Sequence, residues 1–141
     1  MKICITTMGP NLDAPIDPRF GRCQFFLMVD SESLKFEAIP NQGMGAMRGA
    51  GIAAAQIVAS SGAKAVITGN VGPNAFMVLN QSGIKVFAGV LGVTAKQALE
   101  AFKNGQIPET PGPTAPGIGP GGGFGGGRGP GGGRGRGGRG W

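Results

Sequence analysis

The sequence predicts an α/β domain with a mixed five-stranded sheet, helices covering the faces of that sheet, and a disordered C-terminal tail. Three observations predict this arrangement. Short β-branched apolar runs open the chain, helical and strand-like segments alternate after residue 50, and glycine, proline and arginine dominate after residue 110. The folded domain is expected to span residues 1–108, and the tail residues 109–141.

The first part of the domain is predicted to contribute three strands, at residues 2–7, 23–30 and 34–40. The first is an apolar run rich in β-branched residues, and the polar Asp-Ser-Glu-Ser turn at residues 30–33 joins the other two into an antiparallel hairpin. A long irregular loop, residues 8–20, follows the first strand. Loops of this length in compact domains usually have a function.

The second part of the domain is predicted to alternate helices with buried strands. The first helix covers residues 52–61 and ends at Gly62, the second begins at Pro73 and ends at Gly83, and Thr94 caps the third. Strands at residues 65–68 and 84–88 separate them. In α/β sheets ligands bind beyond the carboxyl ends of the strands, so three loops are expected to meet there.

Charge and composition limit the classes of function. The net charge is +6, of which residues 111–141 supply +4 through Arg128, Arg134, Arg136 and Arg139. Such an excess favours a polyanion: nucleic acid, an acidic membrane surface or an anionic cofactor. Two cysteines and no histidine exclude a disulfide framework and a histidine-based zinc site within one chain.

The sequence also predicts that the protein is not an enzyme. It has no histidine base, no Ser–His or Cys–His pair and no CxxC motif. Met1 runs directly into the first strand without a signal-peptide pattern, and no apolar stretch is long enough to span a membrane. We therefore expect a soluble cytoplasmic protein that does not bind a membrane.

Two glycine-rich turns are candidate anion sites. Arg48, Gly49 and Gly51 precede the first helix, where free N–H groups and the helix dipole attract anions and Arg48 adds a full charge. The spacing lacks the third glycine of a dinucleotide fingerprint. The alternative is a loop whose glycines serve close packing.

The second turn contains Asn70, Gly72 and Asn74, between a buried strand and the next helix. The two asparagine side chains can donate hydrogen bonds to a ligand, and the helix start again offers N–H groups. The alternative is a tight turn in which the glycines serve geometry alone.

Sulfur-containing side chains are candidate metal ligands. Arg19 and Arg22 lie close to Cys23 and would favour its thiolate, the form that ligates iron. Met44 and Met47 offer soft thioether sulfur. Three alternatives stay open: Cys23 is a small buried residue, as Cys4 is expected to be; the two arginines pair with Asp13 and Asp17; and the methionines are simply exposed.

Four sequence blocks together resemble the dinitrogenase iron-molybdenum cofactor biosynthesis family, over roughly residues 1–107. They are the N-terminal MKICI, IDPRFGRCQFF at residues 16–26, GAGIAAAQ at 49–56 and GPNAF at 72–76. The resemblance implies a ribonuclease H-like three-layer fold without nuclease activity. It also implies binding, carriage or storage of an iron-sulfur or iron-molybdenum cluster, with partners that donate or accept the cluster and possible homo-oligomerisation.

The sequence departs from the family pattern in one respect. Many relatives carry histidines in the loop at residues 41–48, where this chain has none. This favours charge-based binding of an anionic cluster over ligation by histidine, and it leaves molybdenum specificity unsupported. Archaeal relatives with basic glycine-rich tails resemble iron-sulfide storage or assembly proteins.

The tail supports a competing hypothesis. Its arginines, with Phe124 and Trp141 spaced by glycine, resemble RGG segments that stack on RNA bases. The same arginines would serve an inorganic polyanion. A third possibility is a tail that solubilises the protein or mediates self-association.

Overall fold

The structure, a computed structural model, describes residues 1–42 and 49–114 of the 141-residue chain. The described residues form strands and helices in the predicted order β-β-β-α-β-α-β-α. The elements are β1 (Lys2–Thr7), β2 (Phe25–Asp30), β3 (Phe36–Pro40), α1 (Ala50–Ser60), β4 (Ala65–Ile67), α2 (Pro73–Gln81), β5 (Lys85–Phe87) and α3 (Ala95–Lys103).

The strands form one sheet in the order β3-β2-β1-β4-β5. β2 pairs antiparallel with both β1 and β3, whereas β1, β4 and β5 run parallel to one another. The predicted mixed five-stranded α/β fold is therefore confirmed. The carboxyl ends of the parallel strands share one edge of the sheet with the start of β2 and the end of β3, because Phe25 lies opposite both Thr7 and Pro40.

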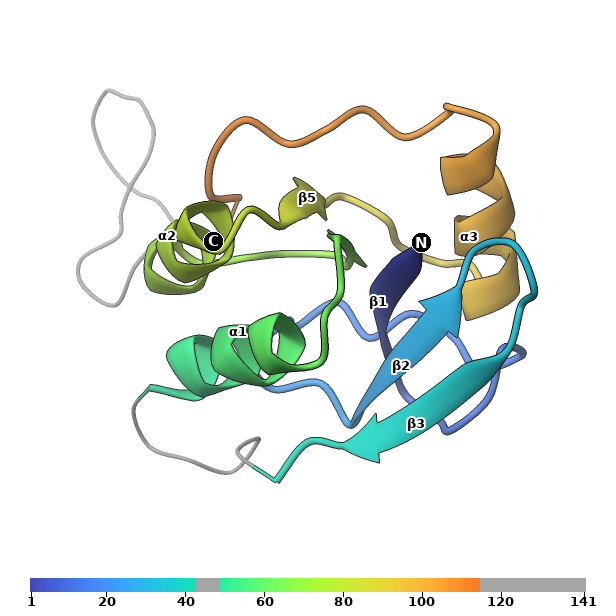
Figure 1. Ribbon diagram of the computed structural model, residues 1–141, viewed down its shortest axis with the longest axis horizontal. Helices are drawn as coiled ribbons and strands as arrows, with labels where there is room; N and C mark the ends of the chain where they lie inside the picture. Colours follow the sequence, from blue (N-terminus) through green and yellow to red (C-terminus); the bar gives the residue numbers. More distant parts are fainter. Residues whose placement is uncertain (43–48, 115–141) are drawn as a thin grey trace.

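Helices cover both faces of the sheet (Figure 1). Alternate residues along a strand point to opposite faces, so Cys4 belongs to one apolar cluster and Ile5 to the other. The first cluster packs against α1 and α2, and the second packs against α3. The result is a three-layer domain, with its loops gathered beyond the strand ends.

Several element boundaries differ from the prediction by one or two residues, among them the starts of β2, β3 and α1. β2 starts at Phe25 rather than residue 23, because the Cys23 carbonyl accepts from the Asn41 side chain and the Gln24 N–H donates to Asp17. β3 likewise starts two residues later than predicted, at Phe36. α1 starts two residues earlier, at Ala50, because Gly49 adopts a left-handed conformation (φ 72°) and turns the chain into the helix.

The predicted helix ends are confirmed. Gly62 and Gly83 have positive φ after α1 and α2, Pro73 is the first residue of α2, and Thr94 forms a capping box with Gln97. Among the described residues, none of the three helices has the length and apolar character needed to cross a bilayer.

The domain boundary predicted after residue 108 stays a prediction. The structure adds that residues beyond it contact the domain, since Thr110 hydrogen-bonds to Val86 and Thr114 to Val71. The rest of the tail lies outside the described residues.

Candidate functional site

Segments distant in the sequence meet at the edge formed by the carboxyl ends of the parallel strands. We call this region the rim and define it as residues 17–24, 49–51 and 69–74. Asn70 joins two of the segments: its N–H donates to the Pro18 carbonyl (2.8 Å), and its carbonyl accepts from the Phe20 N–H (3.2 Å). Arg19 and Asn70 thereby form a parallel bridge. The loop after β1 and the turn after β4 thus meet beyond the strand ends, where three loops were expected.

Asp17 organises the first segment of the rim. Its fully buried carboxylate accepts hydrogen bonds from the Arg19 N–H (3.1 Å) and the Gln24 N–H (3.2 Å). Its backbone is tied to β1, because the Asp17 N–H donates to the Thr6 carbonyl (2.9 Å) and the Thr6 hydroxyl donates to the Asp17 carbonyl (2.7 Å). The backbone of Asp17 therefore fixes the loop to the sheet. Its carboxylate closes the loop by binding the N–H groups of Arg19 and Gln24.

Arg19 brings positive charge to the rim. Its Nε and Nη2 donate to the two carboxylate oxygens of Asp17, at 3.2 and 3.3 Å. Pairing of this arginine with Asp17 is one of the alternatives that the sequence left open. The Arg19 side chain is nevertheless 57% exposed. Hydrogen bonding to Asp17 raises the pKa of the Arg19 guanidinium, so this cation stays charged at every working pH.

Glycines allow the rim segments to approach closely. A Cβ on Gly21 would lie 2.7 Å from the Gly51 nitrogen and 2.8 Å from its Cα, so the loop rests directly on the first turn of α1. A Cβ on Gly51 would lie 3.2 Å from the Cβ of Ala75 in α2. Gly51 therefore has the packing role that the sequence left open as an alternative.

The turn after β4 contains one glycine that packs closely against other residues and one that does not. A Cβ on Gly69 would lie 2.6 Å from the Pro18 Cα and 2.8 Å from Leu91 Cδ2. Gly72 has no such neighbour within 4 Å, so packing gives no reason for a glycine there. Asn70 and Asn74 are both exposed on this turn.

α1 and α2 both begin at the rim without a side-chain cap from the described residues. Gly49 and Gly72 occupy the two N-cap positions, neither makes a side-chain capping bond, and neither first turn contains an acidic residue. N–H groups at a helix start carry partial positive charge and accommodate anions. The rim therefore combines the exposed Arg19 and Arg22 with two helix starts.

The expectation that neighbouring arginines favour a Cys23 thiolate is wrong for this structure. Cys23 is buried, and burial, followed by the negative charge of Asp17, raises the pKa of its thiol to about 12. The opposing effect of Arg19 is smaller, since that arginine is already paired with Asp17. Cys4 is buried as predicted, and burial raises the pKa of its thiol as well.

Sequence reasoning missed Asn41. Its side-chain Nδ2 donates to the carbonyls of Gly21 (3.1 Å) and Cys23 (2.9 Å), and its N–H donates to the Gln24 carbonyl (3.0 Å). Asn41 therefore holds the segment before β2 in place and helps to cover Cys23. The sequence carries no signal for this role, because it depends on the burial of Asn41 and on its contacts with residues about twenty positions away.

The remaining predicted site residues divide into two groups. Arg22 is exposed at the rim, between Gly21 and Cys23. The other predicted residues lie outside the described part of the chain; they are Met44, Met47, Arg48, Arg128, Arg134, Arg136 and Arg139.

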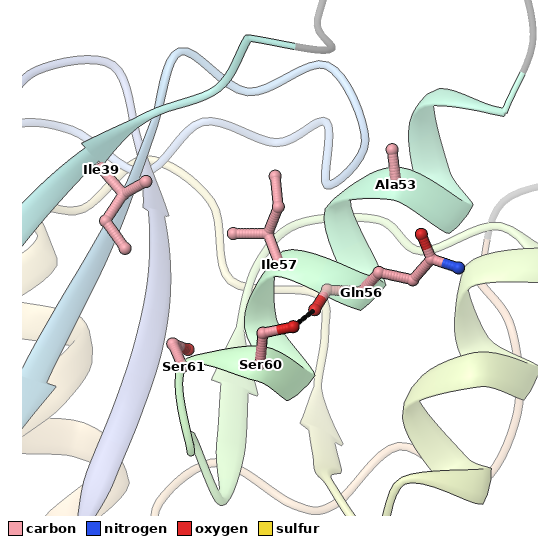
Figure 2. A pocket seen from close by; sticks show the side chains of 6 residues that line it. All are labelled: Ile39, Ala53, Gln56, Ile57, Ser60 and Ser61. Atoms are coloured by element: carbon pink, nitrogen blue, oxygen red, sulfur yellow. Dashed lines mark hydrogen bonds between the residues drawn. The ribbon is translucent and has the colours of Figure 1, made fainter.

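An open groove of about 510 Å³ lies between β3 and α1. Figure 2 shows Ile39 on one side of it and Ile57 on the other, with Ser60 bonded to the Gln56 carbonyl of its own helix. No charged side chain is among the residues that line it: Ile39, Ala53, Gln56, Ile57, Ser60 and Ser61. The groove therefore fits an anion poorly compared with the rim.

Within residues 1–42 and 49–114, no three histidine, cysteine, aspartate or glutamate side chains are grouped so that they could hold a metal ion. The chemistry that the described rim can offer is hydrogen-bond donation and positive charge.

The fold and its rim define a small three-layer α/β domain that presents donors and charge beyond the strand ends. The family model described as dinitrogenase iron-molybdenum cofactor matches residues 1–105. The chain belongs to this family, as its sequence blocks predicted. An uncharacterised protein of Methanocaldococcus jannaschii is 37% identical over 75 residues, which cover 51% of this chain and 64% of that protein.

Solved structures share the fold. The apo form of the orange protein from Desulfovibrio gigas is 43% identical, with a TM-score of 0.79 over 81% of this chain and 96% of that one. A NifB-like protein from Thermotoga is 32% identical, with a TM-score of 0.68 over 77% and 91% of the two chains. A dinitrogenase-type protein from M. jannaschii, 18% identical with a TM-score of 0.60 over 80% and 97%, shares the fold alone.

Proposed function

We propose that the chain binds an anionic metal-sulfur cluster at the rim and carries or stores it without catalysing a reaction. The description of its family names the iron-molybdenum cofactor. The similar D. gigas protein was solved in an apo form, a term that implies a bound group in its other state. The proposed cargo is therefore an iron-sulfur or iron-molybdenum cluster, which partner proteins would supply and receive.

The observation that carries this proposal is the backbone bridge of Arg19 with Asn70 beside two helix starts that no side chain in the described part of the chain caps. A guanidinium has five N–H donors, and two of the Arg19 nitrogens bond to Asp17. The remaining donors can contact an anion. The exposed side chains of Asn70 and Asn74 add neutral donors from the turn after β4.

The proposed binding set extends this centre to its neighbours at the rim. Arg22 would add charge, and the backbone at Gly49, Gly51 and Gly72 would present the helix starts to the anion. Direct ligation by Cys23 stays a prediction, and it requires that the thiol first be uncovered and deprotonated.

Anaerobic incubation of the full chain with iron(II) and sulfide, followed by desalting, tests the proposal. We expect a brown protein fraction that retains iron and acid-labile sulfide together. Metal analysis of protein purified without oxygen then identifies the cluster's composition. A colourless fraction with neither element above the level of a control protein of similar net charge would refute cluster binding.

RNA binding through the tail is the second candidate function. It is supported by the four tail arginines and by Phe124 and Trp141, each of which follows a glycine. Four cations predict a salt dependence with a slope of only about −3 on single strands. Filter binding of single-stranded RNA at low and at moderate salt tests this function, and no retention at low salt would eliminate it.

A further inference from the structure

The two edges of the sheet differ in what covers them. β5 forms one edge, and Thr110 pairs with it: its N–H donates to the Val86 carbonyl (2.8 Å), and its hydroxyl accepts from the Ala88 N–H (2.8 Å). β3 forms the other edge (Figure 1). Within residues 1–42 and 49–114, no backbone segment other than β2 pairs with β3. In that part of the chain, β3 is therefore the edge that is open to another strand.

Phe36 and Ala38 present their backbone groups away from the sheet. Hydrogen-bonded pairs alternate along an antiparallel ladder. The Asn41 N–H donates to the Gln24 carbonyl (3.0 Å), so the odd-numbered residues of β3 are those that bond to β2. The N–H and C=O groups of Phe36 and Ala38 therefore point outward, and no group among the described residues pairs with them. Pro40 has no N–H, so an added strand would find donors only at Phe36 and Ala38.

The apolar groove between β3 and α1 lies next to this open edge. Its volume of about 510 Å³ is within the range of ligand pockets, about 300–1,000 Å³. Figure 2 shows Ile39 and Ile57 on its two sides. The Ser60 hydroxyl donates to the Gln56 carbonyl (2.8 Å), and the Ser61 hydroxyl likewise donates to the backbone of α1. An apolar side chain can therefore enter the groove without breaking these bonds.

A strand added antiparallel to β3 would pair with the edge and fill the groove at the same time. Side chains alternate between the two faces along a strand, and Ile39 packs against the cluster on the α1 face. The residue opposite Ile39 would therefore enter the groove, and the residue two positions later would lie opposite Glu37. Glu37 is exposed, and the described residues give it no ion pair. A basic residue opposite it is favoured, because cross-strand pairs of opposite charge stabilise a sheet.

We infer that β3 and α1 form a docking site for an extended segment of a partner protein, in which a large apolar residue is followed two positions later by lysine or arginine. Main-chain bonds to Phe36 and Ala38 would supply affinity, and the groove together with Glu37 would select the sequence. This inference does not rest on the proposed function, because the site uses none of the rim residues.

The charge on β3 argues for a separate partner rather than a second copy of the chain. If two copies paired Phe36 of one with Ala38 of the other, their Glu37 side chains would lie opposite each other. Like charges in that position destabilise the pair. Charged residues and proline on an edge strand are a common means of preventing such self-pairing. A segment with a basic residue opposite Glu37 meets no such repulsion.

Fluorescence anisotropy with the full chain tests the inference. The probe is a labelled peptide, Thr-Thr-Ile-Thr-Lys-Thr-Thr, and the control peptide has glutamate in place of lysine. We expect the lysine peptide to bind about fivefold more tightly. The net charge of the chain, +6, would favour the opposite order. Glu37→Lys should reverse the preference, whereas Glu32→Lys, the same change in the exposed hairpin turn, should not.

N-methylated peptides test the main-chain bonds without changing the protein. A methyl group on the nitrogen of the threonine between isoleucine and lysine removes the N–H that would donate to the Ala38 carbonyl. This change should weaken binding about tenfold. Methylation of the lysine nitrogen is the matched control, because that N–H would point away from β3.

Amide hydrogen exchange locates the bound peptide. At about ten times its dissociation constant, the lysine peptide should slow exchange at the Phe36 and Ala38 N–H groups about tenfold. Exchange at Asn74, at the rim, should not change.

Two results would overturn the inference. One is equal binding of the lysine, glutamate and N-methylated peptides, with no protection of Phe36 and Ala38. The other is slow exchange at these two N–H groups before any peptide is added, which would mean that the chain itself or a second copy already covers the edge. Sedimentation velocity would then distinguish a monomer from a dimer.

Discussion

Arg19 and Asn70 lie side by side at the rim, although a strand, a hairpin and a helix separate them in the sequence. The contact is made by the backbone, because Asn70 bonds to Pro18 on one side of Arg19 and to Phe20 on the other. The turn after β4 therefore fixes the backbone of Arg19, and Asp17 holds its exposed guanidinium. The proposed function requires that an anion bound by Arg19 also contact the starts of α1 and α2.

Replacing Arg19→Gln should weaken retention of iron and sulfide about tenfold, because a charge-assisted donor is lost. The measurement is the iron and sulfide retained after desalting of anaerobically loaded protein. Lys35→Gln is the matched control, since it removes one exposed charge at the hairpin beyond the opposite end of the sheet. An equal loss in both variants would mean that only net charge matters.

Replacing Asp17→Asn should lower the free energy of unfolding by about 1–3 kcal/mol, because the buried carboxylate accepts several hydrogen bonds that an amide cannot all replace. Urea denaturation measures the change. Asp13→Asn, an exposed change in the same loop, should stay within about 0.5 kcal/mol of the wild type. A similar small effect at Asp17 would contradict its role in closing the loop.

Replacing Gly21→Ala should destabilise the domain by about 1–3 kcal/mol, because the new Cβ would meet the backbone of Gly51. Gly112→Ala serves as the control, since no atom lies within 4 Å of the added Cβ. Thermal unfolding of both variants measures the difference. If Gly21→Ala is as stable as the control, the loop does not rest on α1 as described.

The sheet and helices could be predicted because each has a strong local signal. β-branched runs mark the strands, and Pro73, Gly83 and Thr94 mark helix ends. The boundary of β2 could not be predicted, because it depends on the contacts of residues 23 and 24 with Asp17 and Asn41.

The candidate site was predictable in outline only. The sequence identified Arg19 and Asn70, but whether Gly51 packs or binds depends on the proximity of Gly21 in three dimensions. Composition also missed the contacts that residues 110–114 make with the domain, because a segment rich in proline and glycine looks unable to fold. Thr110 and Thr114 attach it through hydrogen bonds to backbone groups of Val86, Ala88 and Val71.

The buried Cys23 thiol predicts a pH dependence of stability. In the unfolded chain the thiol ionises near its ordinary pKa of 9.0, whereas in the folded protein its pKa is about 12. Above pH 9 the unfolded state therefore binds fewer protons than the folded state, and the free energy of unfolding falls as the pH rises. The stabilising contribution is complete below pH 9 and is lost towards pH 12.

The comparison of wild type with Cys23→Ala isolates this effect from other titrating groups. Between about pH 9 and about pH 10, the free energy of unfolding of the wild type should fall more steeply, by at most about 1.4 kcal/mol per pH unit. Urea denaturation across this range measures both slopes. Parallel curves for the two proteins would show that the thiol is not protected by the fold.

The most direct test of the central claim is to map where the cluster binds. An ¹⁵N-labelled full chain is loaded anaerobically with iron(II) and sulfide, and the broadening of each amide signal by the paramagnetic iron is recorded. We predict that broadening is strongest at Arg19, Gly51, Asn70 and Asn74. Broadening centred on the groove at Ile39 and Ser60, with the rim unaffected, would contradict binding at the rim.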